Sequence, residues 1–156
     1  MVSIEIPGYR HLMLDHLVLD FNGTIACDGT LIGGLAQILE RISEHVSIHV
    51  ITADTHGFAA EQLEGVPCTI HILSAGRQEE AKAAFVKDLG ENHVVAIGNG
   101  RNDRTMLKVA EVGIAVISPE ALAVETLSAA DIVAHDILFA LDLLINPLRL
   151  VATLRS

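Results

Sequence analysis

The chain has 156 residues, of which 51% are hydrophobic and 19% are charged. This length is close to the commonest size of one domain, and the composition excludes a disordered chain. The formal net charge of −10 argues against nucleic acids and anionic membrane surfaces as partners, because both would be repelled. The same charge repels phosphorylated substrates unless the binding site holds a cation.

The ends of the chain carry no targeting or membrane signal that we can identify. The first ten residues lack a basic segment followed by an apolar run, and polar residues interrupt the apolar stretch after Ile137. We therefore expect a cytoplasmic protein without a membrane span. Cys27 and Cys68 lack CxxC spacing, which favours reduced thiols without a metal, and the eight histidines show no zinc-ligand spacing.

Short apolar runs alternate with helical patterns along the chain. Strands are predicted over residues 16–19, 46–51, 69–73, 94–97, 114–117 and 132–134, several of them almost entirely aliphatic, as in strands covered on both faces. Helices are predicted over residues 35–44, 58–64, 78–89, 104–110 and 119–127. A helical tail is expected over residues 136–155, with Pro147 starting or kinking its last helix, and residues 2–14 could form a hairpin.

This alternation predicts a single α/β domain over residues 1–156, with a doubly wound, mostly parallel sheet. Ligands bind such sheets at the carboxyl ends of the strands. Asp20, Thr52 and the segment 98–103 each follow a predicted strand directly. We therefore expect them to meet at one edge of the sheet.

The first candidate motif is Asp-Phe-Asn-Gly-Thr at residues 20–24, directly after an apolar strand. A carboxylate in this position can attack phosphorus and form an aspartyl-phosphate. Gly23 allows close approach of the backbone to a ligand, and N–H groups of the turn can hold phosphate oxygens. An ordinary acidic turn is the alternative. A second Asp-Gly-Thr, at residues 28–30, lacks a preceding strand and is interpreted as a turn.

Two weaker candidates follow. The Thr52 hydroxyl could donate to a phosphate oxygen, although a cap of the next helix, supplied by Thr52, Asp54 or Thr55, is the favoured interpretation. Lys82 lies beside the apolar stripe of its predicted helix and could neutralise a phosphate. The alternative is a surface lysine whose stem packs on the protein, and Lys87 is the competing choice.

The segment 98–103 reads Gly-Asn-Gly-Arg-Asn-Asp and is the most specific local signal. Asn102 or Asp103 could cap the following helix. A cap alone does not explain the two glycines that precede them.

The order of these four motifs resembles that of the haloacid dehalogenase superfamily. Its first motif reads Asp-x-Asp-Gly-Thr, its second is a strand-end Ser or Thr, its third is a lysine, and its fourth is often Gly-Asp-Gly-x-Asn-Asp. Within that superfamily the chain looks most like the phosphorylation domain of P-type ATPases, which have Thr-Gly-Asp where this chain has Thr-Ala-Asp at residues 52–54. The resemblance extends over residues 17–134.

The resemblance implies a three-layer, Rossmann-like fold, a Mg²⁺ cofactor and a phosphoryl-transfer hydrolase that forms an aspartyl-phosphate on Asp20. It assigns catalysis to Asp20, Asn22, Thr52 and Lys82. Phosphate binding is assigned to Gly23, Thr52, Ala53, Lys82 and Asn102. The metal ligands are assigned to Asp20, Asn22 (through its backbone carbonyl), Asn99 and Asp103. Mg²⁺ and Lys82 would supply the positive charge that a phosphate needs in so acidic a chain.

Two replacements depart from the family pattern. Phosphatases of the family usually have Asp two residues after the nucleophile, as a general acid and base, but this chain has Asn22. An amide cannot exchange that proton, so slow turnover is expected unless another group, such as His56, substitutes. Asn99 stands where the family often has an acidic Mg²⁺ ligand, which predicts weaker metal binding.

Asp20 and Thr52 are 32 residues apart, which leaves no room for a cap domain between them. Capless members of the family tend to oligomerise or to take large substrates, so a homo-oligomer is one expectation. The tail leucines could form a docking surface, although a helix packed on the sheet is the preferred interpretation. Two functions remain open: a Mg²⁺-dependent phosphatase, and a catalytically weak domain that binds a phosphate ligand or a protein partner.

Overall fold

The computed structural model describes residues 1–54, 57–74 and 76–156. Its centre is a six-stranded sheet in the order β10-β9-β8-β3-β6-β7, in which every neighbouring pair is parallel. The strands are β3 (His16–Asp20), β6 (Ser47–Thr52), β7 (Thr69–Ile72), β8 (Val94–Gly98), β9 (Val112–Val116) and β10 (Ile132–Ala134). The chain runs outward from β3 through β6 to β7, and then returns to the other side of β3 for β8, β9 and β10, as in a doubly wound sheet.

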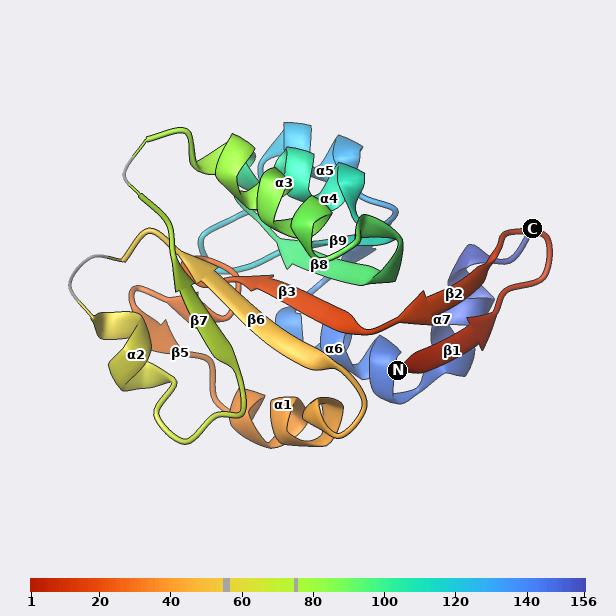
Figure 1. Ribbon diagram of the computed structural model, residues 1–156, viewed down its shortest axis with the longest axis horizontal. Helices are drawn as coiled ribbons and strands as arrows, with labels where there is room; N and C mark the ends of the chain where they lie inside the picture. Colours follow the sequence, from red (N-terminus) through yellow and green to blue (C-terminus); the bar gives the residue numbers. More distant parts are fainter. Residues whose placement is uncertain (55–56, 75) are drawn as a thin grey trace.

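Helices cover both faces of the sheet and make three layers (Figure 1). One face carries α3 (Gln78–Asp88), α4 (Arg104–Val109) and α5 (Val124–Ala129), and the other carries α1 (Leu35–Ser43) and α6 (Ile137–Ile145). Alternate residues of β3 pack into different cores, Leu17 and Leu19 into one and Val18 into the other. Burial on both faces explains why the middle of the strand, residues 17–19, is aliphatic. The predicted fold class is confirmed.

The two ends of the chain pack together beside the sheet (Figure 1). The expected hairpin forms from β1 (Val2–Glu5) and β2 (His11–Leu14), which pair antiparallel. The last helix, α7 (Pro147–Leu154), begins at Pro147 and contacts β1. The Ser156 hydroxyl donates to the Gly8 carbonyl over 2.8 Å, which ties the C-terminus to the turn of the hairpin.

The tail packs mainly on the rest of the protein, as preferred from the sequence. Leu141 and Leu144 are buried in the core, whereas Leu148 is exposed. Within the described ranges, no single helix is long and apolar enough to cross a membrane. Only α6 and α7 taken together, with a 102° bend between them, satisfy the length and composition of a span.

The predicted boundaries agree with the structure to within two residues, except for the helix predicted over residues 119–127. That prediction is wrong at its start, because α5 begins at Val124. Ala121 has a φ of 70°, in the left-handed region that a helix excludes. The Ala121 N–H donates to the Ser118 carbonyl, and the Ala123 N–H donates to the Asn99 carbonyl over 3.0 Å. The segment therefore forms a loop that supports the residue after β8.

A short ribbon follows β3, made of β4 (Ala26–Cys27) and β5 (Thr30–Leu31). Asp28 and Gly29, at φ 49° and 78°, form its turn, which confirms the interpretation of the second Asp-Gly-Thr. Two 3₁₀ turns, Glu91–His93 and Arg101–Asp103, flank β8, and α2 (Phe58–Gln62) precedes β7. Only β4, β5 and α1 lie between β3 and β6, so no cap domain is inserted there.

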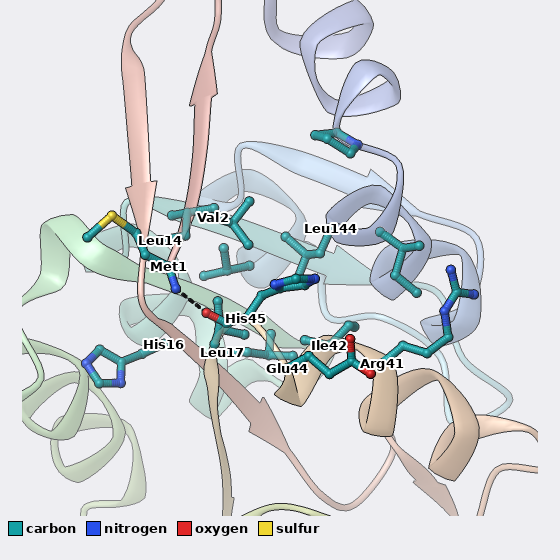
Figure 2. A pocket seen from close by; sticks show the side chains of 14 residues that line it. Met1, Val2, Leu14, His16, Leu17, Arg41, Ile42, Glu44, His45 and Leu144 are labelled. Atoms are coloured by element: carbon teal, nitrogen blue, oxygen red, sulfur yellow. Dashed lines mark hydrogen bonds between the residues drawn. The ribbon is translucent and has the colours of Figure 1, made fainter.

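A cavity of about 470 Å³ opens at the amino ends of the strands, away from the predicted motifs (Figure 2). Its walls are mostly apolar, with His16, Arg41 and His45 among the lining residues. None of the residues that the sequence singled out for chemistry lines it. The cavity lies between the hairpin strands and the ends of α1 and α6.

Gly113 is required by the contact between β9 and α4. A Cβ at this position would lie 2.3 Å from the Leu107 carbonyl oxygen, which is backbone and cannot rotate away. We expect Gly113→Ala to lower the free energy of unfolding by about 2 kcal/mol, measured by urea denaturation followed by circular dichroism. Gly33→Ala is the control, because a Cβ there meets no atom within 4 Å. Equal stability of the two variants would contradict this account.

Candidate active site

Side chains from three strand ends meet at the carboxyl edge of the sheet, as the sequence predicted. Asp20 ends β3, Thr52 ends β6, and Asn99 follows β8. A pocket of about 350 Å³ opens there. Its lining comprises Asp20, Phe21, Asn22, Gly29, Thr52, Ala53, Asp54, Phe58, Gln78, Lys82 and Asn102.

The centre of this site is a buried cluster of two carboxylates and one ammonium group. The Lys82 Nζ lies 2.6 Å from the Asp20 Oδ1 and 2.6 Å from the Asp103 Oδ1. Lys82 is 2% exposed and Asp103 is 0% exposed. Helix α3 thus directs Lys82 inward, toward the sheet edge, whereas Lys87 on the same helix is exposed. Of the two candidate lysines, the structure places Lys82 in the site.

The cluster carries one more negative than positive charge when all three groups are ionised. Burial, followed by the negative charge of Asp103, raises the pKa of Asp20 to about 7. Burial opposes the charged form of Lys82, but the two carboxylates outweigh it and raise the pKa of Lys82. Lys82 therefore stays protonated, and Asp20 lacks a second positive charge. A divalent cation beside Asp20 would supply that charge.

Thr24 joins Asp20 to the loop after β8, a role that the sequence reasoning missed. Its hydroxyl lies 3.0 Å from the Asp20 Oδ2 and 3.2 Å from the Asn99 Oδ1. Thr24 is the last residue of the first motif, so the motif itself contained the signal. The shared hydroxyl brings the oxygens of Asp20 and Asn99 to the same point in the site.

Asp103 supports the loop at residues 98–103 from inside. Its Oδ2 accepts the N–H groups of Asn99 and Gly100, over 3.0 Å and 2.8 Å. A Cβ on Gly98 would lie 2.6 Å from the Asp103 side chain, which explains the first glycine of the motif. Lys82 contacts the other oxygen, so Asp103 holds both Lys82 and the loop. The metal ligation that the sequence predicts for Asp103 stays a prediction.

Gly23 leaves space for a neighbouring side chain, and its N–H group is not available for the phosphate contact that the sequence predicted. Its N–H donates to the Ala26 carbonyl over 2.8 Å and is therefore not directed at a ligand. Its φ is 79°, and a Cβ there would lie 2.7 Å from the Asn99 Nδ2. Glycine is required because a side chain would displace Asn99 from Asp20.

In the second motif, one residue can contact a phosphate and another caps a helix, which are the two interpretations that the sequence left open. The buried Thr52 accepts the Asp54 N–H on its Oγ1 over 3.0 Å, which leaves its hydroxyl proton to donate to a ligand oxygen. The Asp54 Oδ2 accepts the Ala59 N–H over 2.7 Å, so Asp54 caps α2. Ala53 lines the pocket between them.

The remaining predicted residues lie on the pocket wall. Asn102 donates to the Gln78 Oε1 over 2.9 Å, and both amides line the pocket. Gln78 is a second residue that the sequence reasoning missed. Asn22 is exposed at the pocket, and Thr55 and His56 lie outside the described residues.

The oxygen donors present fit a hard divalent cation. Asp20 supplies a carboxylate, and the Asn99 side-chain oxygen is held beside it by Thr24. Burial and the neighbouring Asp103 raise the pKa of Asp20, and a cation beside this carboxylate would favour its charged form. Magnesium prefers such oxygen ligands and usually binds through one or two carboxylates, with water completing its shell. The second family carboxylate is an amide here, so we expect modest affinity.

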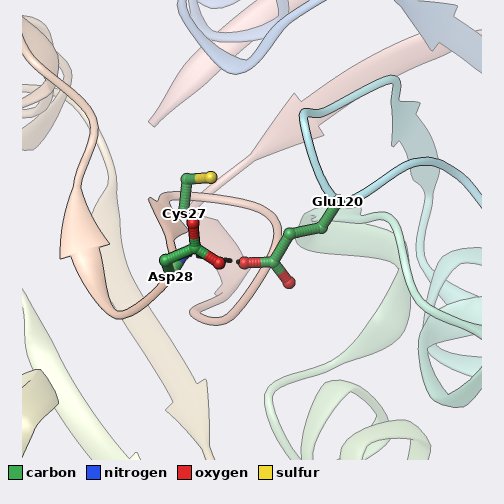
Figure 3. Close-up of side chains that lie close together, drawn as sticks. All are labelled: Cys27, Asp28 and Glu120. Carbon is green, nitrogen blue, oxygen red and sulfur yellow. Dashed lines mark hydrogen bonds between the residues drawn. The ribbon is translucent and has the colours of Figure 1, made fainter.

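A second group of ligand-type atoms lies on the surface near Gly23 (Figure 3). The ligand atoms of Cys27, Asp28 and Glu120 lie within 4.8 Å of one another, although the sequence predicted no metal at Cys27. The Glu120 Oε1 accepts the Asp28 N–H over 2.9 Å. This bond joins the turn between β4 and β5 to the loop before α5. Exposed acidic groups commonly gather in this way without an ion, and we assign the group a structural role.

The charge imbalance in the cluster predicts a pH-dependent effect of Asp20→Asn without divalent cations. A carboxyl whose pKa is raised from 3.8 to about 7 by folding stabilises the folded state at low pH. That contribution is lost as the pH rises from about 4 to 7. Asparagine does not ionise, so it removes this loss. The free energy of unfolding of Asp20→Asn should therefore exceed that of wild type by about 2 kcal/mol at pH 8 and by much less at pH 4. Urea denaturation in EDTA measures this.

The exposed Asp88 provides the control, because Asp88→Asn should change the free energy of unfolding little at either pH. Adding Mg²⁺ at pH 8 should stabilise wild type but not Asp20→Asn, since the ion binds only the folded site. A pH-independent difference between Asp20→Asn and wild type would contradict the assigned charges.

The two lysines of α3 provide a matched test of the cluster. Lys82→Met leaves Asp20 and Asp103 buried without their shared cation. We expect it to lower the free energy of unfolding at pH 7 by about 3 kcal/mol. Lys87→Met, at an exposed position, should cost less than about 0.5 kcal/mol. Comparable losses in both variants would mean that the buried cluster does not stabilise the fold.

The comparisons with known proteins agree with this geometry. Residues 80–134 match the model of the haloacid dehalogenase-like hydrolase family. An uncharacterised protein of Methanocaldococcus jannaschii is 43% identical over 85 residues, which span 52% of this chain and 91% of that protein.

Solved structures share the fold at low sequence identity. The 3-deoxy-D-manno-octulosonate 8-phosphate phosphatase of Moraxella catarrhalis, in complex with magnesium, phosphate and the sugar acid, superposes with a TM-score of 0.70, 15% identity and coverage of 85% of this chain and 86% of the phosphatase. The cobalt-bound enzyme of Haemophilus influenzae gives 0.70, with 11% identity over 85% and 88%. A zinc-transporting PIB-type ATPase in its E2.Pi state gives 0.64, with 24% identity over 79% of this chain and 20% of the transporter. In the order of its motifs, in residues 80–134 and in its fold, the chain is similar to the haloacid dehalogenase-like hydrolases.

Proposed function

We propose that the chain is a Mg²⁺-dependent phosphatase that works through an aspartyl-phosphate on Asp20. The observation that carries this proposal is the position of Lys82, buried between Asp20 and Asp103 in a pocket that Thr52 also lines. Burying an ammonium group between two carboxylates is costly, and charge clusters of this kind concentrate at functional sites.

The residues of the pocket divide the reaction between them. An Asp20 oxygen attacks phosphorus, the bond from phosphorus to the leaving oxygen breaks, and water later hydrolyses the aspartyl-phosphate. Lys82 and the Thr52 hydroxyl would hold the oxygens of the phosphoryl group as charge moves onto them. Asp20, the Asn22 carbonyl and Asn99 would hold Mg²⁺, which would neutralise the phosphate in this acidic chain. Thr24 and Asp103 position these groups.

The comparisons support a phosphatase and a metal, without naming this chain's substrate. Proteins of the same fold include a phosphatase bound to magnesium and phosphate and a related enzyme bound to cobalt. Asn22 stands in the place of a family proton donor, which is why we expect turnover to be slow.

The direct test is hydrolysis of p-nitrophenyl phosphate with and without Mg²⁺, by wild type and Asp20→Asn. We expect slow turnover that needs Mg²⁺ and falls at least about 1,000-fold in the variant, because the nucleophile is removed. Circular dichroism establishes that the variant is folded. Turnover that survives in Asp20→Asn would overturn the assigned nucleophile. A folded wild type that binds phosphate but turns over nothing would favour the binding-domain alternative.

A further inference from the structure

The pocket of Asp20 contains an aromatic surface that the reaction described above does not use. Phe58, at the start of α2, lines this pocket and is 59% exposed. The other aromatic lining residue, Phe21, is buried in the core. Phe58 therefore offers the pocket an aromatic surface at the rim, outside the buried Asp20 and Lys82.

The size of the pocket limits what can lie against that ring. Its volume of about 350 Å³ is at the small end of the range for ligand sites. A phosphoryl group held by Lys82 and Thr52 would take part of that space. What remains fits one small ring better than an extended chain.

The charge of the pocket further limits the leaving group. Asp20 and Asp54 line it together with a single ammonium group, Lys82, and the whole chain carries −10. A leaving group with its own carboxylate or second phosphate would be repelled. An uncharged leaving group avoids that cost.

Asn22 adds an independent chemical constraint. An amide donates no proton to a departing oxygen, and in the described lining the remaining groups are committed, since Lys82 bridges two carboxylates and Asp54 caps α2. With the groups of the described lining alone, the bond from phosphorus to oxygen would break with its electron pair left on that oxygen, without protonation. A phenolate can depart in this way, because its conjugate acid has a pKa of about 10. An alkoxide cannot do so readily, because its conjugate acid is about as weak an acid as water.

On the basis of the proposed phosphatase activity, we propose that the substrates are phosphate monoesters of uncharged aromatic alcohols, with Phe58 stacking on the ring of the leaving group. The two requirements are separable. Asn22 selects for a leaving oxygen of low basicity, and Phe58 selects for a flat ring.

Three probe substrates separate these requirements, each assayed with Mg²⁺. Phenyl phosphate has a ring and a phenolate leaving group, acetyl phosphate has a weakly basic leaving group without a ring, and glycerol 2-phosphate has neither. For wild type we expect kcat/KM for phenyl phosphate to exceed that for glycerol 2-phosphate by about 100-fold, which is the usual contribution of a general acid that is lacking here.

Variants then assign each requirement to its residue. Phe58→Ala should lower kcat/KM for phenyl phosphate about fivefold, mainly through KM, and leave acetyl phosphate unchanged. Phe139→Ala is the matched control, because Phe139 is a similarly exposed phenylalanine on α6 that does not line the pocket. Asn22→Asp should raise hydrolysis of glycerol 2-phosphate relative to phenyl phosphate, because it supplies the proton.

The outcomes distinguish this inference from the proposed function. If wild type hydrolyses none of the three probes, the phosphatase proposal fails and this inference fails with it. If glycerol 2-phosphate is hydrolysed as fast as phenyl phosphate, the substrate class is overturned while the phosphatase stands. An equal loss for acetyl phosphate in Phe58→Ala, or the same loss in Phe139→Ala, would also overturn the role of Phe58.

Discussion

One ammonium group shared by two buried carboxylates determines the shape of this site. Lys82 comes from α3, Asp20 from the end of β3 and Asp103 from the turn after β8. None of these groups could be buried alone, because an unpaired charge in the core costs several kcal/mol. The cluster therefore couples one helical layer to the central strands at the point where the ligand would bind.

The hydrogen bonds around the cluster extend it into a single network. Asp103 holds the loop after β8 through the N–H groups of Asn99 and Gly100, and Thr24 joins Asn99 to Asp20. Gly23 and Gly98 are part of the same network, since a Cβ at either would collide with Asn99 or Asp103. Gly23 and Gly98 thus leave space for the polar side chains of Asn99 and Asp103.

The replacement of two family carboxylates by Asn22 and Asn99 leaves the nucleophile and the lysine in place. In the proposed reaction, these replacements would remove a proton donor and one formal charge at the metal site. A site of this composition suits reactions in which the leaving group departs unaided, and the exposed Phe58 beside it suits an aromatic leaving group. Asp20, Thr52 and Lys82 are nevertheless all retained in the site, where they are buried.

The sequence by itself determined the fold class, nearly all element positions and the convergence of Asp20, Thr52 and the 98–103 loop. It could do so because aliphatic runs and strand-end polar residues are local signals. Only the tertiary structure decided which lysine enters the site, since Lys82 and Lys87 look alike along the chain. Only the structure shows that Asp103 contacts Lys82 and that the Gly23 N–H bonds within its own turn. Likewise, a loop at Ala121 stands where the sequence predicted the start of a helix. Each of these outcomes depends on partners distant in sequence, and no local pattern records them.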